Sequence, residues 1–148
     1  MTGMRVYISG PLTNDGNDGA DRIEHLKKFY ENIAKVCEQK GYIVYVPHLH
    51  TDPVIHASVS PRDVYNIDVR EVAKADLVLA YVGQPSHGVG AEVERAFHTG
   101  TKVVLLYEQG TKISRLIRGC PAVVAEVKFT GEEDGLRQIG LFIGSFNE

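Results

Sequence analysis

The sequence predicts an α/β fold: one domain, residues 1–148, built on a doubly wound, mainly parallel five-stranded sheet with the flavodoxin-like strand order 2-1-3-4-5. Three observations carry this prediction. A chain of 148 residues has the usual length of a single domain. Short β-branched or apolar runs alternate with segments of helical period along the chain. Residues 76–82 (DLVLAYV) are nearly all apolar, as expected of a central parallel strand that is covered on both faces.

The first two expected strands flank a long helix. Residues 5–10 (RVYISG) form a β-branched and aromatic run that ends in glycine, and residues 42–47 (YIVYVP) have the same character. Between them we expect a helix over residues 21–40, because its apolar residues recur every three or four positions. Gly41 suits the C′ position that follows the last turn of this helix.

A loop and a second helix follow. Residues 48–59 have no clear period and are expected to form a loop. Ser60, Pro61 and Asp63 then supply an N-cap, a first-turn proline and an acid at N3. The second helix therefore runs from Ser60 to about Lys74.

The second half of the chain continues the alternation. After the strand at 76–82 come a glycine-rich loop and a helix from about 90 to 99. Residues 102–107 (KVVLLY) and 122–129 (AVVAEVKF) are the fourth and fifth expected strands. A last helix is expected over about 132–146.

The composition excludes several function classes. A formal net charge of −3 and an isoelectric point near 6.1 give no electrostatic basis for binding nucleic acid or an anionic membrane. No apolar run approaches the ~20 residues that a membrane helix needs. The two cysteines, Cys37 and Cys120, have neither metal nor redox spacing, so we expect reduced thiols and a cytoplasmic protein.

Motifs for cofactors and metals are weak. The stretch GVGAEV lacks a third glycine and does not directly follow the first strand, so it is a poor match to a dinucleotide fold. No Walker lysine follows a glycine-rich stretch, and no G-x-S-x-G elbow is present. His48, His50 and His56, with Asp52 between them, match no standard zinc spacing. We therefore expect no cofactor and no metal.

The position of the site follows from the expected topology. In doubly wound folds ligands bind beyond the carboxyl ends of the strands. Four loops emerge at that edge of the sheet, so the site should be assembled from residues 10–19, 48–59, 83–90 and 108–118.

Two acids occupy inward-facing helical positions. Asp68 shares a row with Val64 and Val72, and Glu92 shares a face with Val93. We expect Glu92 in the first turn of its helix, where free N–H groups favour the anionic carboxylate. We expect partial burial and the charge of its neighbour Glu92 to raise the pKa of Asp68. One anion and one proton carrier are what cleavage of a glycosidic bond needs. The same residues also fit a helix cap at Glu92 and an ion pair of Asp68 with a buried arginine.

Four stretches together resemble the nucleoside 2-deoxyribosyltransferase-like family, and within it most closely the 2′-deoxynucleoside 5′-monophosphate N-glycosidases. They are VYISGPLT, YNIDVREVAKADLVLAYV, QPSHGVGAEVERA and SRLIRG, in family order between residues 5 and 119. The specific part of the match is the acid of G-V-G-x-E together with the aspartate eight residues before Asp76.

The resemblance implies a covalent, retaining mechanism. Glu92 would attack C1′ of the sugar, Asp68 would assist departure of the base and later position a water, and Tyr7 would orient Glu92. Tyr7 would also crowd the sugar 2′ position, which favours deoxyribose and leaves ribose open. The substrate-binding residues that the resemblance implies are Ser9, Gly10, Thr13, His48, Ser86, Gly88, Gly90 and Ser114.

Phosphate contacts distinguish the branches of this family. The resemblance implies that Ser86 binds the 5′-phosphate and that Ser114 reaches the site from a neighbouring subunit, which makes the protein a homodimer. The first loop, GPLTNDGNDG, departs from the hydrolase pattern because it carries no arginine, although Thr13 could replace a phosphate-binding hydroxyl. Arg115 or Arg118 of the neighbour could compensate, or both could be surface charges.

The expected function is hydrolysis of the N-glycosidic bond of a (2′-deoxy)nucleoside 5′-monophosphate through a covalent glycosyl–Glu92 intermediate. Two alternatives stay open. One is base exchange between deoxynucleosides, as in the transferases, and the other is a catalytically silent nucleotide-binding module. The expected partners are a small nucleotide substrate and a second copy of the chain, with no nucleic acid and no membrane.

Overall fold

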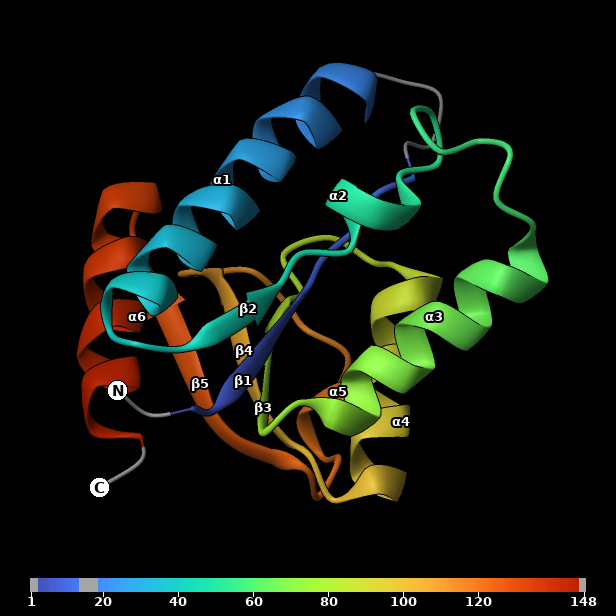
Figure 1. Cartoon of the computed structure of the whole chain (residues 1–148). Coiled ribbons are helices and arrows are strands. Elements are labelled where there is room, and N and C mark those ends of the chain that lie inside the picture. The colour runs from blue at the N-terminus through green and yellow to red at the C-terminus, as the bar shows by residue number, and fades with distance from the viewer. Residues whose placement is uncertain (1–2, 14–18, 147–148) are drawn as a thin grey trace.

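The computed structural model describes residues 3–13 and 19–146 and has one five-stranded sheet in the order β2-β1-β3-β4-β5 (Figure 1). Each neighbouring pair of strands in it is parallel. The predicted fold class and strand order are confirmed. The strands are β1 (Arg5–Ser9), β2 (Ile43–Tyr45), β3 (Leu77–Tyr81), β4 (Lys102–Glu108) and β5 (Val123–Phe129).

Helices cover both faces of this sheet (Figure 1). The two helices nearest the chain ends, α1 and α6, lie side by side on one face, and α3 packs against α4 on the other. Two short helices, α2 and α5, follow the carboxyl ends of β2 and β4. The helices are α1 (Gly19–Gln39), α2 (His48–Thr51), α3 (Pro61–Lys74), α4 (His87–Thr99), α5 (Arg115–Arg118) and α6 (Glu132–Ser145).

Strand β1 delivers alternate side chains to the two faces, as the period of two requires. Val6 and Ile8 join the apolar cluster under α1 and α6, whereas Tyr7 joins the cluster under α3 and α4. Ser9, two residues beyond Tyr7, shares the face of Tyr7. All five residues of β3 are buried between β1 and β4, as the apolar run at 76–82 predicted.

The predicted start of the helix after β3 is wrong. We expected the helix to begin near Gly90, but α4 begins at His87, and Ser86 caps it by accepting a hydrogen bond from the Val89 N–H (3.2 Å). Gly88 and Gly90 lower the helix propensity of the first turn, which explains why the sequence pattern alone placed the start too late. The correction moves Glu92 out of the first turn.

Two connections are also more ordered than expected. The loop predicted over 48–59 begins with helix α2, and the segment after β4 contains helix α5. Both helices are only four residues long, which is too short for a periodic pattern. Residues 14–18 of the predicted first loop lie outside the described residues.

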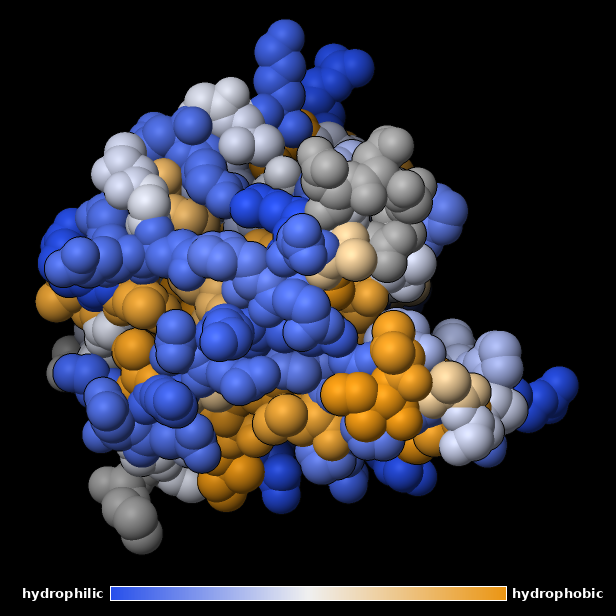
Figure 2. Space-filling view, turned by 90° about the horizontal axis from the view of Figure 1, so that it is seen from above, coloured by the Kyte–Doolittle hydropathy of each residue, from blue (hydrophilic) through white to orange (hydrophobic). Residues whose placement is uncertain are grey.

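The surface seen from above is mostly hydrophilic, with separate hydrophobic areas (Figure 2). The connection between α2 and α3 carries two strongly exposed apolar side chains, Val54 (77% exposed) and Ile55 (75%). Within residues 3–13 and 19–146, none of the helices combines the length and the apolar character that spanning a bilayer requires.

Candidate active site

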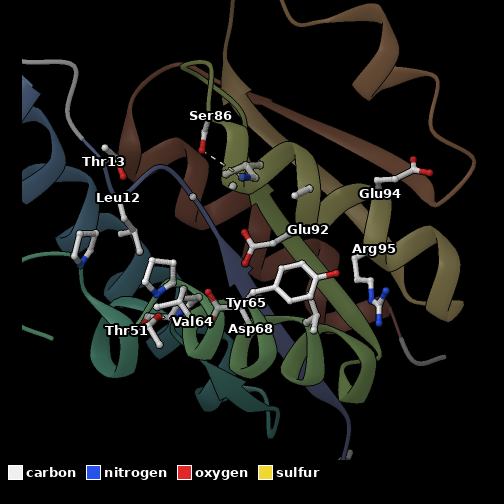
Figure 3. A pocket seen from close by; sticks show the side chains of 18 of the residues that line it. Leu12, Thr13, Thr51, Val64, Tyr65, Asp68, Ser86, Glu92, Glu94 and Arg95 are labelled. Carbon is white, nitrogen blue, oxygen red and sulfur yellow. Dashed lines mark hydrogen bonds between the residues drawn. The ribbon is translucent and has the colours of Figure 1, made fainter. Parts of the chain in front are cut away.

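A cavity of about 710 Å³ opens where the loops at the carboxyl ends of the strands meet α3 and α4 (Figure 3). This volume is typical of small-molecule sites. The walls come from the start of the β1–α1 loop, from the segment between β2 and α3, and from α3 and α4 themselves. Six predicted site residues line it: Gly10, Thr13, Asp68, Ser86, Gly88 and Glu92.

Glu92 is the carboxylate with the most defined surroundings. Its Oε2 accepts a hydrogen bond from the Tyr7 hydroxyl, and its Oε1 accepts one from Ser9 Oγ (2.7 Å). Both donors come from the same face of β1, so one strand fixes both oxygens of the carboxylate. Burial and the nearby Glu92 charge raise the pKa of Tyr7 well above its usual value, so Tyr7 stays a protonated donor.

The ionisation of Glu92 differs from our prediction. We expected the helix start to keep the carboxylate anionic, but Glu92 lies in the second turn of α4, beyond the free N–H groups. Burial is the largest influence and raises the pKa of Glu92 to about 7. The hydrogen bonds from Tyr7 and Ser9 lower this pKa, and the charge of Asp68 raises it further.

Asp68 faces Glu92 across the cavity from α3 (Figure 3). Partial burial raises the pKa of Asp68 to about 6, and the charge of Glu71 contributes in the same direction. The raised value confirms the predicted direction. The Thr51 hydroxyl lies 3.5 Å from Oδ1 of Asp68 and opposes the shift, but its shorter hydrogen bond goes to the Pro47 carbonyl (3.1 Å).

Ser86 lies at the opposite end of the cavity from Asp68 (Figure 3). Its hydroxyl oxygen accepts the Val89 N–H, and its own hydrogen remains available as a donor. The first N–H groups of α4 emerge beside it, and helix N-termini of this kind favour anions. The corrected start of α4 therefore brings the helix N-terminus to the residue predicted to bind phosphate.

Gly10 has a packing reason to be glycine. A Cβ at this position would overlap the ring of Tyr30. The Tyr30 hydroxyl donates a hydrogen bond to the Pro11 carbonyl (3.1 Å), which holds the loop against α1. The loop therefore passes Tyr30 closely while Gly10 also borders the cavity.

Four predicted binding residues do not line this cavity; one is Ser9, which instead holds Glu92 through the hydrogen bond described above. The His48 side chain is buried and its Nε2 contacts Glu31 Oε2 of α1 (2.7 Å), so it packs away from the two acids. Gly90 lies inside the first turns of α4. Ser114 is exposed and, with Ser86 of the same chain, lines a smaller cavity of about 240 Å³ between the β3–α4 connection and the start of α5. Their predicted roles stay predictions.

Several residues that line the cavity were not predicted from the sequence. Thr51 comes from the segment 48–59 that we took for an irregular loop, and Pro47 is the last residue of the strand expected over 42–47. Tyr65 of α3 is exposed and borders the same space. Their position in the chain could have indicated them, because Pro47 and Thr51 lie in the segment that follows β2, at the carboxyl edge of the sheet where ligands bind in such folds.

The loop histidines are engaged in separate contacts. His56 Nδ1 accepts the Asp52 N–H (3.0 Å), and His50 stacks on Tyr45. Within residues 3–13 and 19–146, no three side chains of the histidine, cysteine, aspartate or glutamate type are grouped to hold a metal ion.

Comparison with known proteins finds a matching family and several similar relatives. The sequence profile described as nucleoside 2-deoxyribosyltransferase matches residues 6–138. The chain is 30% identical over 119 residues to a Thermofilum pendens protein with the provisional name 2′-deoxynucleoside 5′-phosphate N-hydrolase 1, covering 78% of both chains. It is 31% identical over 122 residues to the 5-hydroxymethyl-dUMP N-hydrolase of Tetraodon nigroviridis, covering 78% of this chain and 80% of the relative.

A solved structure has the same fold. The CMP N-glycosidase BcmB of Clostridium botulinum superposes with a TM-score of 0.69 at 25% identity. The match covers 93% of this chain and 98% of BcmB.

Proposed function

We propose that this chain, which belongs to the nucleoside 2-deoxyribosyltransferase family, hydrolyses the N-glycosidic bond of (2′-deoxy)nucleoside 5′-monophosphates to a free base and (deoxy)ribose 5-phosphate. The names of its relatives, N-hydrolase and N-glycosidase, support an enzyme of this kind. The observation that carries the proposal is the Glu92 carboxylate, which two hydroxyls of β1 hold in a cavity that Asp68 also lines.

In the first step, a carboxylate oxygen of Glu92 forms a bond to C1′ while the bond from C1′ to the base nitrogen breaks. Asp68 donates a proton to the departing base, which its raised pKa allows near neutral pH. Tyr7 and Ser9 keep the carboxylate oriented toward the sugar. The product is a glycosyl ester of Glu92 and a neutral base.

In the second step, water replaces the base. Asp68, now a carboxylate, accepts a proton from the water whose oxygen bonds to C1′. The ester bond to Glu92 breaks, and the carboxylate returns to its hydrogen bonds with Tyr7 and Ser9. Configuration at C1′ is retained because two displacements take place.

The 5′-phosphate is assigned to the start of α4. Ser86 offers a hydroxyl hydrogen, and the N-terminal end of α4 offers backbone N–H groups and a positive dipole end. Glu92 lies one turn further along the same helix. With this spacing, the start of α4 would contact the phosphate while Glu92 of the same helix reaches the anomeric carbon of the same nucleotide.

The test is a chromatographic base-release assay on the common ribo- and deoxyribonucleoside 5′-monophosphates and the corresponding nucleosides. We expect release from monophosphates and its loss in Glu92→Gln. Glu38→Gln, at an exposed position near the end of α1, is the matched control and should release base at the wild-type rate. A Glu92→Gln variant as active as the wild type would contradict the mechanism.

Base exchange is the second candidate function. The family includes transferases, and the first loop contributes no arginine to the phosphate end. Adding a second free base to the assay separates the two activities, since a transferase forms a new nucleoside with it. Exchange between unphosphorylated nucleosides would favour the transferase.

We also propose that the protein works as a homodimer in which Ser114 reaches the neighbour's site. Ser114 is exposed at the N-cap of α5, in a position that leaves its hydroxyl available. Sedimentation equilibrium should give twice the chain mass. An active monomer would refute this proposal.

A further inference from the structure

Tyr45 lies in the middle of a stack of aromatic rings next to the candidate active site. Its ring is stacked on Tyr7, with centroids 5.6 Å apart and planes inclined by 17°. The His50 ring is stacked on Tyr45 at 4.7 Å and 10°. Since β2 is the edge strand and β1 is its neighbour, Tyr7 covers the inner side of Tyr45 and His50 of α2 covers the outer side.

The sheet register creates the first of these contacts. Tyr7 and Tyr45 are directly paired between the parallel strands β1 and β2. Neighbouring strands lie about 4.8 Å apart, so paired side chains point to the same face at nearly stacking distance. The observed separation is that of an offset-stacked aromatic pair.

The contact bears on the orientation of Glu92. Tyr7 is fully buried, and its hydroxyl donates to Oε2 of the carboxylate. A change in the ring torsions of Tyr7 would move this hydroxyl away from Oε2, and the flat face of Tyr45 blocks such a change. Ring position and hydrogen-bond geometry are therefore linked.

We infer that Tyr45 is a positioning residue for the reaction: its ring fixes Tyr7, and Tyr7 in turn fixes the Glu92 carboxylate. The inference rests on the proposed function. It extends the site by one residue that makes no contact with the cavity and comes from the edge strand of the sheet.

The ring of Tyr45, rather than its hydroxyl, has this role. The hydroxyl is buried and has no hydrogen-bond partner among the described residues. Burial raises its pKa, and the nearby charges of Asp68 and Glu71 on α3 act in the same direction, so it stays neutral. Phenylalanine keeps the stacking face and removes only an unpaired hydroxyl, which makes Tyr45→Phe the conservative control.

The experiment is a double-mutant cycle on base release. Tyr45→Phe should keep kcat within about twofold of the wild type, because the ring remains. Tyr45→Leu should lower kcat by about tenfold with KM unchanged, since it weakens one hydrogen bond to a charged group without touching substrate. In the Tyr7→Phe background, Tyr45→Leu should have no further effect on kcat.

His50→Ala is a second test, because it removes the outer ring of the stack on Tyr45. It leaves the core intact, since His50 is exposed. It should lower kcat by about twofold to threefold in the wild type and not at all in Tyr7→Phe. Equal losses of kcat in both backgrounds, or a change in KM alone, would overturn the inference while the proposed function stands. A wild-type chain that releases no base from any nucleotide or nucleoside would overturn the proposed function, and the inference with it.

Discussion

Replacing Tyr7 by phenylalanine should change the pH dependence of base release, and the pKa values of Glu92 and Asp68 determine how. In the proposed mechanism, the reactive form needs an ionised Glu92 and a protonated Asp68. Their pKa values, about 7 and about 6, are in the opposite order to that requirement. Activity should therefore be greatest between pH 6 and 7, where roughly one molecule in twenty carries the reactive protonation state.

Tyr7→Phe removes one of the two hydroxyls that stabilise the Glu92 anion. A hydrogen bond to a charged group contributes about 1.5–3 kcal/mol, and one pKa unit corresponds to about 1.4 kcal/mol. The pKa of Glu92 should rise by about 1–2 units. Because Asp68 is unchanged, the alkaline limb of the profile moves to higher pH, and kcat/KM at pH 6.5 falls by about 10- to 100-fold.

The assay is kcat/KM for base release from pH 5 to pH 10. The wild-type and Tyr7→Phe profiles should differ by nearly the full factor at pH 6.5 and below and converge by about pH 9–10, where Glu92 is ionised in both proteins. Tyr42→Phe, which removes a buried tyrosine hydrogen bond to the Ile143 carbonyl, should leave the positions of both limbs unchanged. A Tyr7→Phe profile that lies below the wild type by the same factor at every pH would refute the reasoning.

Three further outcomes follow from the same structure. Burial raises the pKa of Glu92 from 4.5 to about 7, so the stability that this carboxyl contributes is fully present below pH 4.5 and is lost as pH rises through 7. In urea unfolding, Glu92→Gln should therefore be more stable than the wild type at pH 8, by up to about 3 kcal/mol, and equally stable at pH 4. Lys27→Met should lower the free energy of unfolding by about 3–5 kcal/mol, because the fully buried Asp52 carboxylate loses the Lys27 ammonium, whose Nζ lies 2.5 Å from Asp52 Oδ2. A loss below about 1 kcal/mol would contradict this expectation. Ser86→Ala should raise KM about tenfold for monophosphates and leave KM for bare nucleosides unchanged, and equal effects on both would remove Ser86 from the phosphate site.

The sequence predicted the fold well because the signals for it are local. An apolar run at 76–82 and the alternation of strand and helix periods do not depend on distant contacts. The inward positions of Asp68 and Glu92 followed from helical spacing in the same way. The start of α4 was missed because two glycines weaken the first turn, although Ser86, three residues before Val89, was a usable N-cap signal.

The properties that the sequence could not predict arise from contacts between distant segments. The pKa of Glu92 depends on burial against β1, more than eighty residues away in the chain, and this outweighs any local effect of its helix. The stacking of Tyr45 on Tyr7 depends on the register between β1 and β2. A shift of one residue would send Tyr45 to the other face of the sheet, and the amino-acid pattern of a three-residue strand does not fix that register.

The corrected position of Glu92 explains why a glycine-rich loop and a carboxylate occur so close together. Had Glu92 stood in the first turn of α4, its charge would have competed with the proposed substrate phosphate for the same N–H groups. One turn later, the carboxylate takes its hydrogen bonds from Tyr7 and Ser9 of β1 and leaves the helix start free for the phosphate that we propose to bind there. The proposed nucleophile is then stabilised by two hydroxyls instead of a helix terminus. Under the proposed mechanism, its pKa near 7 would let it ionise near neutral pH and still leave as a carboxylate when water attacks the sugar.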